Sequence, residues 1–319
     1  MKVALIGLGV IGNVHLNIIN NLDVELVGVC DVEPSKLESI KIELRYSDYR
    51  QMLDEVNPDI VHICTPHHLH SEMIIYALEK NINVLCEKPL CINENEIINI
   101  EKVLKRSKGK LGICYQNRYN PSIIYLDEYL KDKKINSVIG NLLWHRDKEY
   151  YSKDYWHGVK KYEGGGVLIN QAIHTIDLLQ HFIGVPNSIV ANVSNVSLKG
   201  VIDVEDTGTI YSLDHSFYLM ATNSASKDYP VSIIIKTENE DIKVLENDLY
   251  VNNQKIQLEE LQKIPNAKKI YGRGHTSLIK DFYDCIKNNK NFEIDFYEAI
   301  KSLKIVLAAY SSEGKEVKL

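Results

Sequence analysis

Short apolar runs alternate with longer amphipathic stretches from residue 2 to about residue 118. Five runs are apolar almost throughout, as strands buried on both faces are: 2-KVALIG-7, 24-VELVGVCD-31, 59-DIVHICTP-66, 83-NVLCEKP-89 and 111-LGICYQN-117. The stretches between them, such as 71-SEMIIYALEKN-81 and 93-NENEIINIEKVLKRS-107, carry apolar residues at helical spacing. This alternation predicts a parallel sheet covered by helices on both faces, which is a doubly wound α/β domain.

The pattern changes after about residue 120. Several β-rich runs with polar alternation follow one another between residues 188 and 257, which is typical of an antiparallel sheet. Helical patterns precede and follow them at 121–134, 169–184, 275–289 and 297–312. We therefore predict two domains, an α/β domain over residues 1–120 and an α+β domain over residues 121–319.

Composition narrows the class of protein. The chain has 319 residues, of which 45% are hydrophobic, and a formal net charge of −6. That charge argues against a broadly basic surface for nucleic acid. No apolar run approaches the roughly 18 residues of a membrane helix, and MKVALIGLGV lacks the cleavage site of an export signal. We expect a cytoplasmic protein whose six cysteines, without CxxC spacing, are reduced thiols.

The segment 7-GLGVIG-12 fits the GxGxxG pattern and joins a predicted strand to a predicted helix. Gly7 permits the tight turn, Gly9 lets a pyrophosphate approach the backbone, and Gly12 allows close helix packing. Asp31 ends the next predicted strand, where a carboxylate accepts hydrogen bonds from ribose hydroxyls and repels a 2′-phosphate. The sequence therefore predicts a dinucleotide site that takes NAD rather than NADP.

A lysine stands at the carboxyl end of the fourth apolar run, in 87-EKP-89. Carboxyl ends of strands in such a sheet face the cofactor crevice, so this motif and 65-TP-66 are expected to line the nicotinamide half. Lys88 serves as a general base only if its pKa falls from about 10.4 toward 7 or 8, which burial and the positive nicotinamide both favour. The alternative is a surface lysine whose stem covers apolar atoms.

The segment 164-GGGVLINQAIHTID-177 is the second candidate for chemistry. Asn170, His174 and Asp177 are spaced at i, i+4 and i+7, so a helix places them on one face. His174 is suited to relaying a proton or binding a hydroxyl, although a histidine in an amphipathic helix also serves in packing. The glycine triplet favours a functional interpretation because it lets the backbone approach a ligand.

These motifs, together with 116-QNRYNP-121, resemble the Gfo/Idh/MocA family of NAD(P)-dependent sugar and polyol oxidoreductases along essentially the whole chain. The resemblance implies a Rossmann domain followed by a domain with a large, mostly antiparallel open sheet. It implies homodimers or homotetramers formed through that sheet, with the closing helix a candidate for packing back on the Rossmann domain. It also implies hydride transfer between a sugar carbon and the nicotinamide.

The resemblance further assigns roles to single residues. Lys88 and His174 are the expected proton-transfer and substrate-orienting pair, with the choice of base left open. We expect cofactor contacts from Gly7, Gly9, Val10, Ile11, Gly12, Asp31, Thr65, Pro66, His70, Glu87, Lys88 and Gln116. We expect substrate contacts from Arg118, Tyr119, Tyr151, Trp156, Asn170 and His174.

Three features bear on the identity of the substrate. Inositol dehydrogenases of the family carry an aspartate four residues before the histidine, where this chain has Asn170, and an amide cannot relay a proton. The segments NRYNP and 150-YYSKDYWHG-158 look most like the dehydrogenases that oxidise C3 of UDP-N-acetylhexosaminuronic acids, although His157 stands where that branch commonly has arginine. Flat aromatic rings such as Trp156 suit the C–H face of a pyranose, and ordinary packing is their alternative role.

Three other interpretations stay open. An inositol, free-sugar or sugar-lactone enzyme is the alternative within the family. A non-catalytic NAD sensor on the same scaffold is disfavoured because Lys88 and His174 are both present. The cluster 67-HHLH-70 offers imidazoles for a metal, but it lacks the spacing and the further ligands of a zinc site, so we predict no metal.

Overall fold

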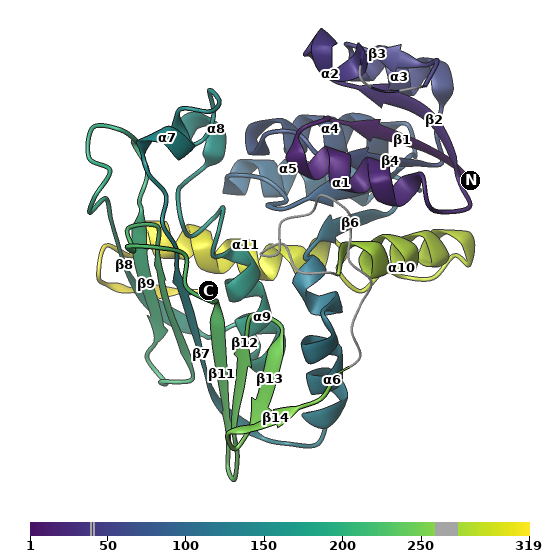
Figure 1. The fold of residues 1–319 in the computed structure, drawn as a ribbon. Coiled ribbons are helices and arrows are strands. Elements are labelled where there is room, and N and C mark those ends of the chain that lie inside the picture. Colours follow the sequence, from purple (N-terminus) through teal and green to yellow (C-terminus); the bar gives the residue numbers. More distant parts are fainter. Residues whose placement is uncertain (39, 41, 259–273) are drawn as a thin grey trace. The chain divides into compact units, whose positions relative to one another are not determined.

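The computed structural model describes residues 1–38, 40, 42–258 and 274–319 (Figure 1). Their contacts divide them into two compact units. The first comprises residues 1–115 and 275–298, and the second comprises residues 116–258, 274 and 299–319. The first unit thus takes in a segment from near the end of the chain as well as the predicted nucleotide domain.

The first unit is built on a six-stranded parallel sheet with the order β3-β2-β1-β4-β5-β6. This order is that of a doubly wound dinucleotide-binding sheet, which confirms the predicted class. The central strands are buried along nearly their whole length, as their apolar sequences require. The strands are β1 (Lys2–Ile6), β2 (Glu25–Cys30), β3 (Arg45–Tyr46), β4 (Ile60–Ile63), β5 (Asn83–Glu87) and β6 (Leu111–Cys114).

Side-chain caps mark the starts of two helices of this unit. Asp48 accepts a hydrogen bond from the Arg50 N–H at the start of α3, and Asn93 accepts one from the Glu96 N–H at the start of α5. Glu96 in turn accepts from the Ile92 N–H, so α5 begins with a reciprocal capping arrangement. The helices are α1 (Val10–Ile19), α2 (Pro34–Glu38), α3 (Tyr49–Val56), α4 (His67–Glu79), α5 (Glu94–Leu104) and α10 (His275–Lys287).

Residues 275–298 complete the sheet of the first unit at its β6 end. A Cβ at Gly112 would lie 2.8 Å from the Phe282 ring and 2.9 Å from the Phe292 ring, so only glycine lets α10 pack this closely on β6. The two rings meet edge to face at 5.1 Å. The Ile113 N–H also donates to the Ile294 carbonyl, so the segment is bonded to the edge of the sheet.

The second unit contains a nine-stranded sheet with the order β14-β13-β12-β11-β7-β10-β9-β8-β15. All neighbours are antiparallel except β7 and β10, which confirms the prediction of a large, mostly antiparallel sheet. Its strands are β7 (Ile135–Leu143), β8 (Ser188–Ser194), β9 (Thr207–Ser212), β10 (Phe217–Thr222), β11 (Ser232–Thr237), β12 (Asp241–Leu245), β13 (Asp248–Val251), β14 (Gln254–Ile256) and β15 (Glu316–Lys318).

Helices cover one face of this sheet. A Cβ at Gly140 on β7 would lie 2.7 Å from the Thr175 methyl and 3.0 Å from Leu179, so α9 packs closely there. This helix starts at Ile173, and the predicted helical start at residue 169 is wrong because residues 167–172 form turns. The remaining helices are the 3-10 helix η1 (Gln116–Tyr119), α6 (Pro121–Tyr129), α7 (Lys148–Tyr151), α8 (Lys160–Glu163), α9 (Ile173–Ile183) and α11 (Phe296–Ser312).

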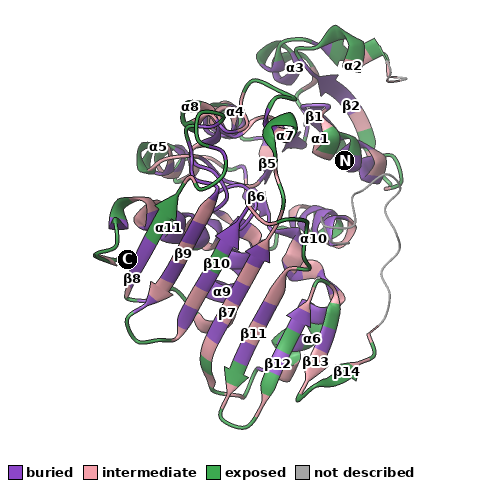
Figure 2. Ribbon diagram, turned by 60° about the vertical axis from the view of Figure 1, so that its left-hand side comes forward, coloured by how far each residue is buried: buried purple, intermediate pink, exposed green. Residues whose placement is uncertain are grey.

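The other face of the sheet is half-exposed. Figure 2 shows buried positions alternating with less buried ones along β7, β9, β10 and β11. Strand pairing places four apolar or aromatic residues in one row across these strands: Tyr211, Tyr218, Ile139 and Ile234.

None of the helices that the structure describes is long and apolar enough to cross a membrane.

Candidate active site

The glycine loop between β1 and α1 has the geometry of a dinucleotide site. Gly7 has a φ of +91°, and a Cβ there would lie 2.4 Å from the Cys64 carbonyl oxygen. A Cβ at Gly12 would lie 1.9 Å from the Gly7 carbonyl oxygen, whereas one at Gly9 would meet no atom within 4 Å. The space beside Gly9 is therefore open, as the close approach of a pyrophosphate would require.

The start of α1 supplies donors to that space. Gly9 is the N-cap residue, and no side chain caps the helix. The amide groups of the first turn, which includes Val10 and Ile11, thus keep their capacity to bind an anion at the positive end of the helix.

Asp31 closes the loop from the end of β2. Its Oδ2 accepts a hydrogen bond of 2.7 Å from the Leu8 N–H, and its Oδ1 accepts one of 2.9 Å from the Glu33 N–H. Each carboxylate oxygen has a second lone pair for a ribose hydroxyl. Lys36 lies beside this carboxylate, with its Nζ 3.8 Å from Asp31 and 2.8 Å from Glu33.

His70 joins two loops at the carboxyl edge of the sheet. Its Nδ1 lies 2.7 Å from the Pro89 carbonyl oxygen and its Nε2 lies 2.8 Å from that of Thr65, and the side chain is fully buried. It therefore connects the TP and EKP motifs through their backbones, and both of its ring nitrogens are occupied. Lys88 is partly buried at this edge and precedes a cis peptide bond to Pro89.

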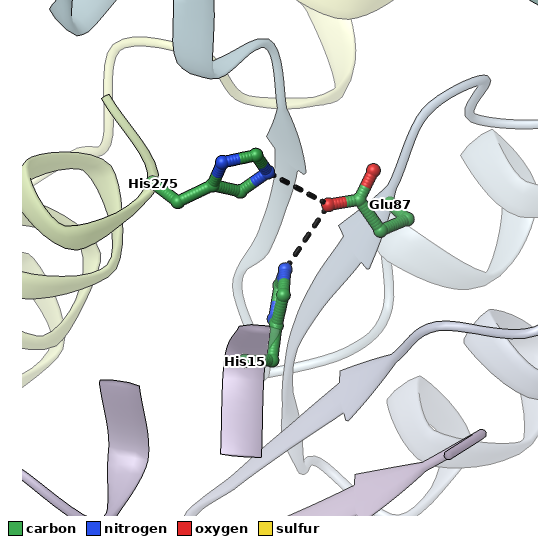
Figure 3. A group of neighbouring side chains, drawn as sticks. All are labelled: His15, Glu87 and His275. Carbon is green, nitrogen blue, oxygen red and sulfur yellow. Dashed lines mark hydrogen bonds and ion pairs between the residues drawn. The ribbon is translucent and has the colours of Figure 1, made fainter. Parts of the chain in front are cut away.

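Glu87, the residue before Lys88, ends β5 inside the unit. Figure 3 shows its Oε1 approached by His15 from α1 and by His275 from the start of α10, at 3.0 and 3.5 Å. Although burial opposes ionisation, the hydrogen bond from His15 and the nearby His275 ring hold the pKa of Glu87 well below its usual value. His15, His62 and His275 were not predicted from the sequence. His15 and His62 each stand in an otherwise apolar run, which is a sign of a buried polar side chain.

In the second unit, His174 and Gln116 lie together. The Gln116 Nε2 is 3.5 Å from the His174 Nε2, and His174 is only partly buried. Asp177, one turn further along α9, faces the interior and binds the Arg118 guanidinium through two hydrogen bonds of 2.7 and 2.8 Å. Ser302 also donates to Asp177.

The geometry of this ion pair bears on the role of Arg118. The arginine and the aspartate are both nearly inaccessible, and their opposite charges compensate each other. Arg118 therefore has a structural partner in the interior, in addition to the substrate contact that we predicted for it. Tyr119 follows it in η1 and is partly buried.

Asn170 donates a hydrogen bond to a buried glutamate that was not predicted from the sequence. Its Nδ2 donates to Glu163 Oε1 at 2.5 Å, and the Gly158 N–H donates to Glu163 Oε2 at 2.5 Å. Burial raises the pKa of Glu163 to about 7, against the opposing effects of His157 and these hydrogen bonds. The carboxyl is thus poised to change its charge near neutral pH.

The aromatic residues Tyr151 and Trp156, predicted to contact the substrate, have different surroundings. Tyr151 is buried with Leu198, Ile202 and Val204, and its hydroxyl accepts a hydrogen bond from Asn223. Trp156 is partly buried and lies against the His157 ring, with the ring centroids 3.7 Å apart. The packing role that we considered for these rings therefore describes the surroundings of Tyr151, whereas Trp156 keeps an exposed edge.

The structure thus gathers the predicted cofactor residues of the first unit at the carboxyl edge of its sheet, and it places Gln116, Asn170 and His174 in the second unit. In the part of the chain that the structure describes, the histidines of HHLH do not converge as metal ligands.

Comparison with known proteins identifies the family of both units. The model of the Gfo/Idh/MocA oxidoreductase family for the NAD-binding Rossmann fold matches residues 1–115. The model for the C-terminal alpha/beta domain of the same family matches residues 133–319. Together they account for most of the chain.

Individual relatives differ in what they act on. Inositol 2-dehydrogenase of Rhizobium meliloti is 27% identical over 216 residues, which is 66% of this chain and 63% of the relative. D-glucoside 3-dehydrogenase of Escherichia coli is 29% identical over 198 residues, 58% of this chain and 55% of the relative. The matched stretches span between 55% and 63% of the length of the curated relatives most similar to the chain.

A solved structure matches over the full chain. The WlbA dehydrogenase of Chromobacterium violaceum, solved with NADH and UDP-GlcNAcA, is 27% identical with a TM-score of 0.85. The match covers 100% of this chain and 96% of that one. The chain therefore belongs to the Gfo/Idh/MocA oxidoreductase family, with an NAD-binding Rossmann fold at its N-terminus and the family's alpha/beta domain at its C-terminus.

Proposed function

We propose that the protein is an NAD-dependent dehydrogenase that transfers a hydride between a hydroxyl-bearing sugar carbon and the nicotinamide. The observation that carries this proposal is the full-length similarity to a dehydrogenase solved with NADH and a nucleotide sugar. The open space beside Gly9 and the uncapped start of α1 support the cofactor. Lys88 after Glu87 and His174 after the glycine triplet support catalysis.

Lys88 and His174 form the proposed proton-transfer pair. In the oxidative direction the substrate hydroxyl gives its proton to one of these side chains while the C–H bond of the same carbon breaks. NAD⁺, when bound, supplies the acceptor for the hydride. The other side chain holds the hydroxyl in place, and Asn170, fixed by Glu163, offers a further polar contact.

We propose a nucleotide sugar of the UDP-N-acetylhexosaminuronate class as the substrate, oxidised at C3. The WlbA similarity supports this class, as do the segments NRYNP and YYSKDYWHG. The second candidate is an inositol or a free sugar, which the curated relatives favour. Asn170 weighs against inositol because an amide cannot relay a proton as the family's aspartate does.

The first test is to incubate the protein with NAD⁺ or NADP⁺ and a panel of UDP-hexosaminuronates, UDP-sugars, free hexoses and inositols. NADH absorbance reports turnover, and mass spectrometry identifies the keto product. A 3-keto UDP-sugar formed with NAD⁺ is the expected result. Turnover of free polyols alone would refute the nucleotide-sugar part of the proposal.

Variants then test the catalytic pair on the substrate so identified. Lys88→Met should lower kcat by at least about 100-fold, which is the usual contribution of a positioned acid or base. Lys102→Met on the exposed face of α5 is the matched control and should retain full activity. Unchanged turnover in Lys88→Met would remove this lysine from the mechanism.

We also propose that the second unit forms homodimers or homotetramers through the half-exposed face of its sheet. The row Tyr211, Tyr218, Ile139 and Ile234 forms an apolar stripe, and Met220 beside it is 44% exposed. Such stripes on a monomer mark association surfaces. Ile234→Lys should lower the mass measured by light scattering to that of a smaller oligomer, and an unchanged mass would refute this surface.

A further inference from the structure

A second group of chemically able side chains lies inside the first unit, beneath the carboxyl edge of the sheet. The Nε2 atoms or carboxylate oxygens of His15, Glu87 and His275 all lie within 4.8 Å of one another (Figure 3). All three residues are buried, with exposed fractions of 0, 5 and 1%. A solvated acidic patch therefore does not explain this cluster.

The register of the sheet explains why these side chains meet. Glu87 pairs with Cys114 on β6, and His62 on β4 pairs with Leu85, two residues before Glu87. Paired residues of parallel strands, and residues two apart on one strand, point to the same face. Glu87, Cys114 and His62 thus share a face of the sheet.

Two helices bring the other ligands to this face. His15 lies on α1, and its Nδ1 is bonded to the Nδ1 of His62 at 2.8 Å. His62 is bonded in turn to the Tyr283 hydroxyl at 2.8 Å through its Nε2. His62 and Tyr283 therefore orient the His15 ring from behind, as the outer partners of metal-binding histidines do.

His275 has no comparable support. Among the described residues, neither of its ring nitrogens has a hydrogen-bond partner of good geometry, although its Nε2 lies 3.5 Å from Glu87 Oε1. A buried imidazole left in this state is costly. Its Nε2 points at the same carboxylate oxygen as that of His15, so a cation at this position would satisfy both rings (Figure 3).

We propose that His15, Glu87 and His275 bind a divalent transition-metal ion. Two imidazoles and a carboxylate match zinc(II), which accepts this set of three protein ligands with a water molecule in the fourth position. The ion fastens α1, α10 and the end of β5 to one another, and its binding does not depend on the identity of the substrate.

The test begins with the full-length protein expressed without a polyhistidine tag, because a tag would itself bind metal. Elemental analysis should find about one zinc ion per chain. Unfolding with a chelator and refolding with Co²⁺ should give visible absorption bands of protein-bound cobalt.

Histidine variants separate this site from adventitious binding. His275→Asn should lose the metal, and it removes a side chain that makes no hydrogen bond of good geometry with the described residues. His215→Asn is the matched control and should keep the metal; His215 lies in a turn with a φ of 62°, which asparagine tolerates. Equal metal content in both variants would overturn the proposal.

The wild-type protein provides a measurement that does not depend on folding of a variant. Protein refolded with Zn²⁺ should melt at least about 5 °C above protein refolded with chelator, because a ligand that binds only the native state stabilises it. A protein that folds and melts identically in both conditions, and that takes up no Zn²⁺ or Co²⁺, would show that the cluster holds protons alone.

Discussion

Glu163 accepts a hydrogen bond from Asn170, a candidate substrate-binding residue, so the charge of Glu163 directly affects that side chain. Its pKa is raised from 4.5 to about 7, chiefly by burial, so the folded protein holds a proton that the unfolded chain releases. Stability from this group is present below pH 4.5 and is lost as pH rises through 7. The loss amounts to roughly 3 kcal/mol in the free energy of unfolding.

Glu163→Gln should remove that dependence because an amide does not titrate. Urea unfolding of both proteins between pH 5 and 8 is the measurement. The stability of the wild type relative to the variant should fall as the pH rises, and curves that stay parallel would contradict the assigned pKa. If substrate binding depends on Asn170, the KM of the wild type should change over the same range and that of Glu163→Gln should not.

A second prediction concerns the side chain of His70. Its two nitrogens face two carbonyl oxygens, so a neutral ring donates to only one of them at a time. His70→Ala leaves both buried carbonyls without this partner and should lower the free energy of unfolding by about 2 kcal/mol. The KM for NAD should rise with it, because the TP and EKP loops lose their connection, and an unchanged KM would limit His70 to a structural role.

Single residues also show how far sequence reasoning reaches. The GxGxxG spacing predicted a tight turn at Gly7 and close packing at Gly12, and both glycines have such close approaches. The bond from the Leu8 N–H to Asp31 was not predicted. His15 and Glu163 were missed because their partners lie 72 and 7 positions away in the chain, and a local pattern does not show which partner a buried polar residue meets.

The loop between β1 and α1 allows a prediction at the level of an element. Gly9→Ala adds a methyl group to open space at a φ of −70°, so the protein should fold with unchanged stability. That methyl occupies the space proposed for the pyrophosphate, so the Kd for NADH should rise at least about tenfold. Fluorescence titration of NADH, together with urea unfolding, separates the two effects.

Gly12→Ala is the matched variant within the same loop. Its methyl group would lie 1.9 Å from the Gly7 carbonyl oxygen, so the loop must shift and the stability must fall. Overpacking of this kind costs about 1 to 3 kcal/mol. Equal effects of the two variants on stability would contradict the geometry of the loop.

Elements differed in how well the sequence predicted them. Five of the six strands of the first sheet were predicted because residues buried on both faces leave a continuous apolar run, whereas the short β3 (Arg45–Tyr46) was missed. The start of α9 was misplaced because the segment 169–172 continues the helical spacing of apolar residues while its backbone forms turns. Within the region 188–257 that was predicted as β-rich, residues 241–251 form two strands, since Glu246 adopts a φ of 54° and the chain reverses there.

At the scale of the whole molecule, the order of elements predicted the two sheets but not which segment completes each one. Residues 275–298 follow strands β7 to β14 of the second sheet in the sequence and nevertheless group with the first unit. Their amphipathic pattern shows that one face is buried, but it does not show against what. The contact with Gly112 becomes visible only when β6 and α10 lie side by side.

This segment leads to the last prediction, which concerns independent folding of the first unit. Phe282 and Phe292 are 0 and 4% exposed and meet over Gly112. Burial of two such rings contributes about 5 kcal/mol, which is comparable to the whole stability of a domain. A fragment of residues 1–115 should therefore be unstable, with exposed apolar surface that binds a hydrophobic dye.

Joining residues 275–298 to that fragment through a flexible linker should restore a cooperative unfolding transition and NADH binding. The same fusion with Phe282→Asp is the control and should behave like the fragment alone, because a buried charge without a partner is strongly destabilising. If residues 1–115 fold and bind NADH as well as the fusion does, α10 is not needed to complete the core. Nucleotide binding would then be a property of the N-terminal segment alone, and the late segment would serve only to tie the end of the chain to it.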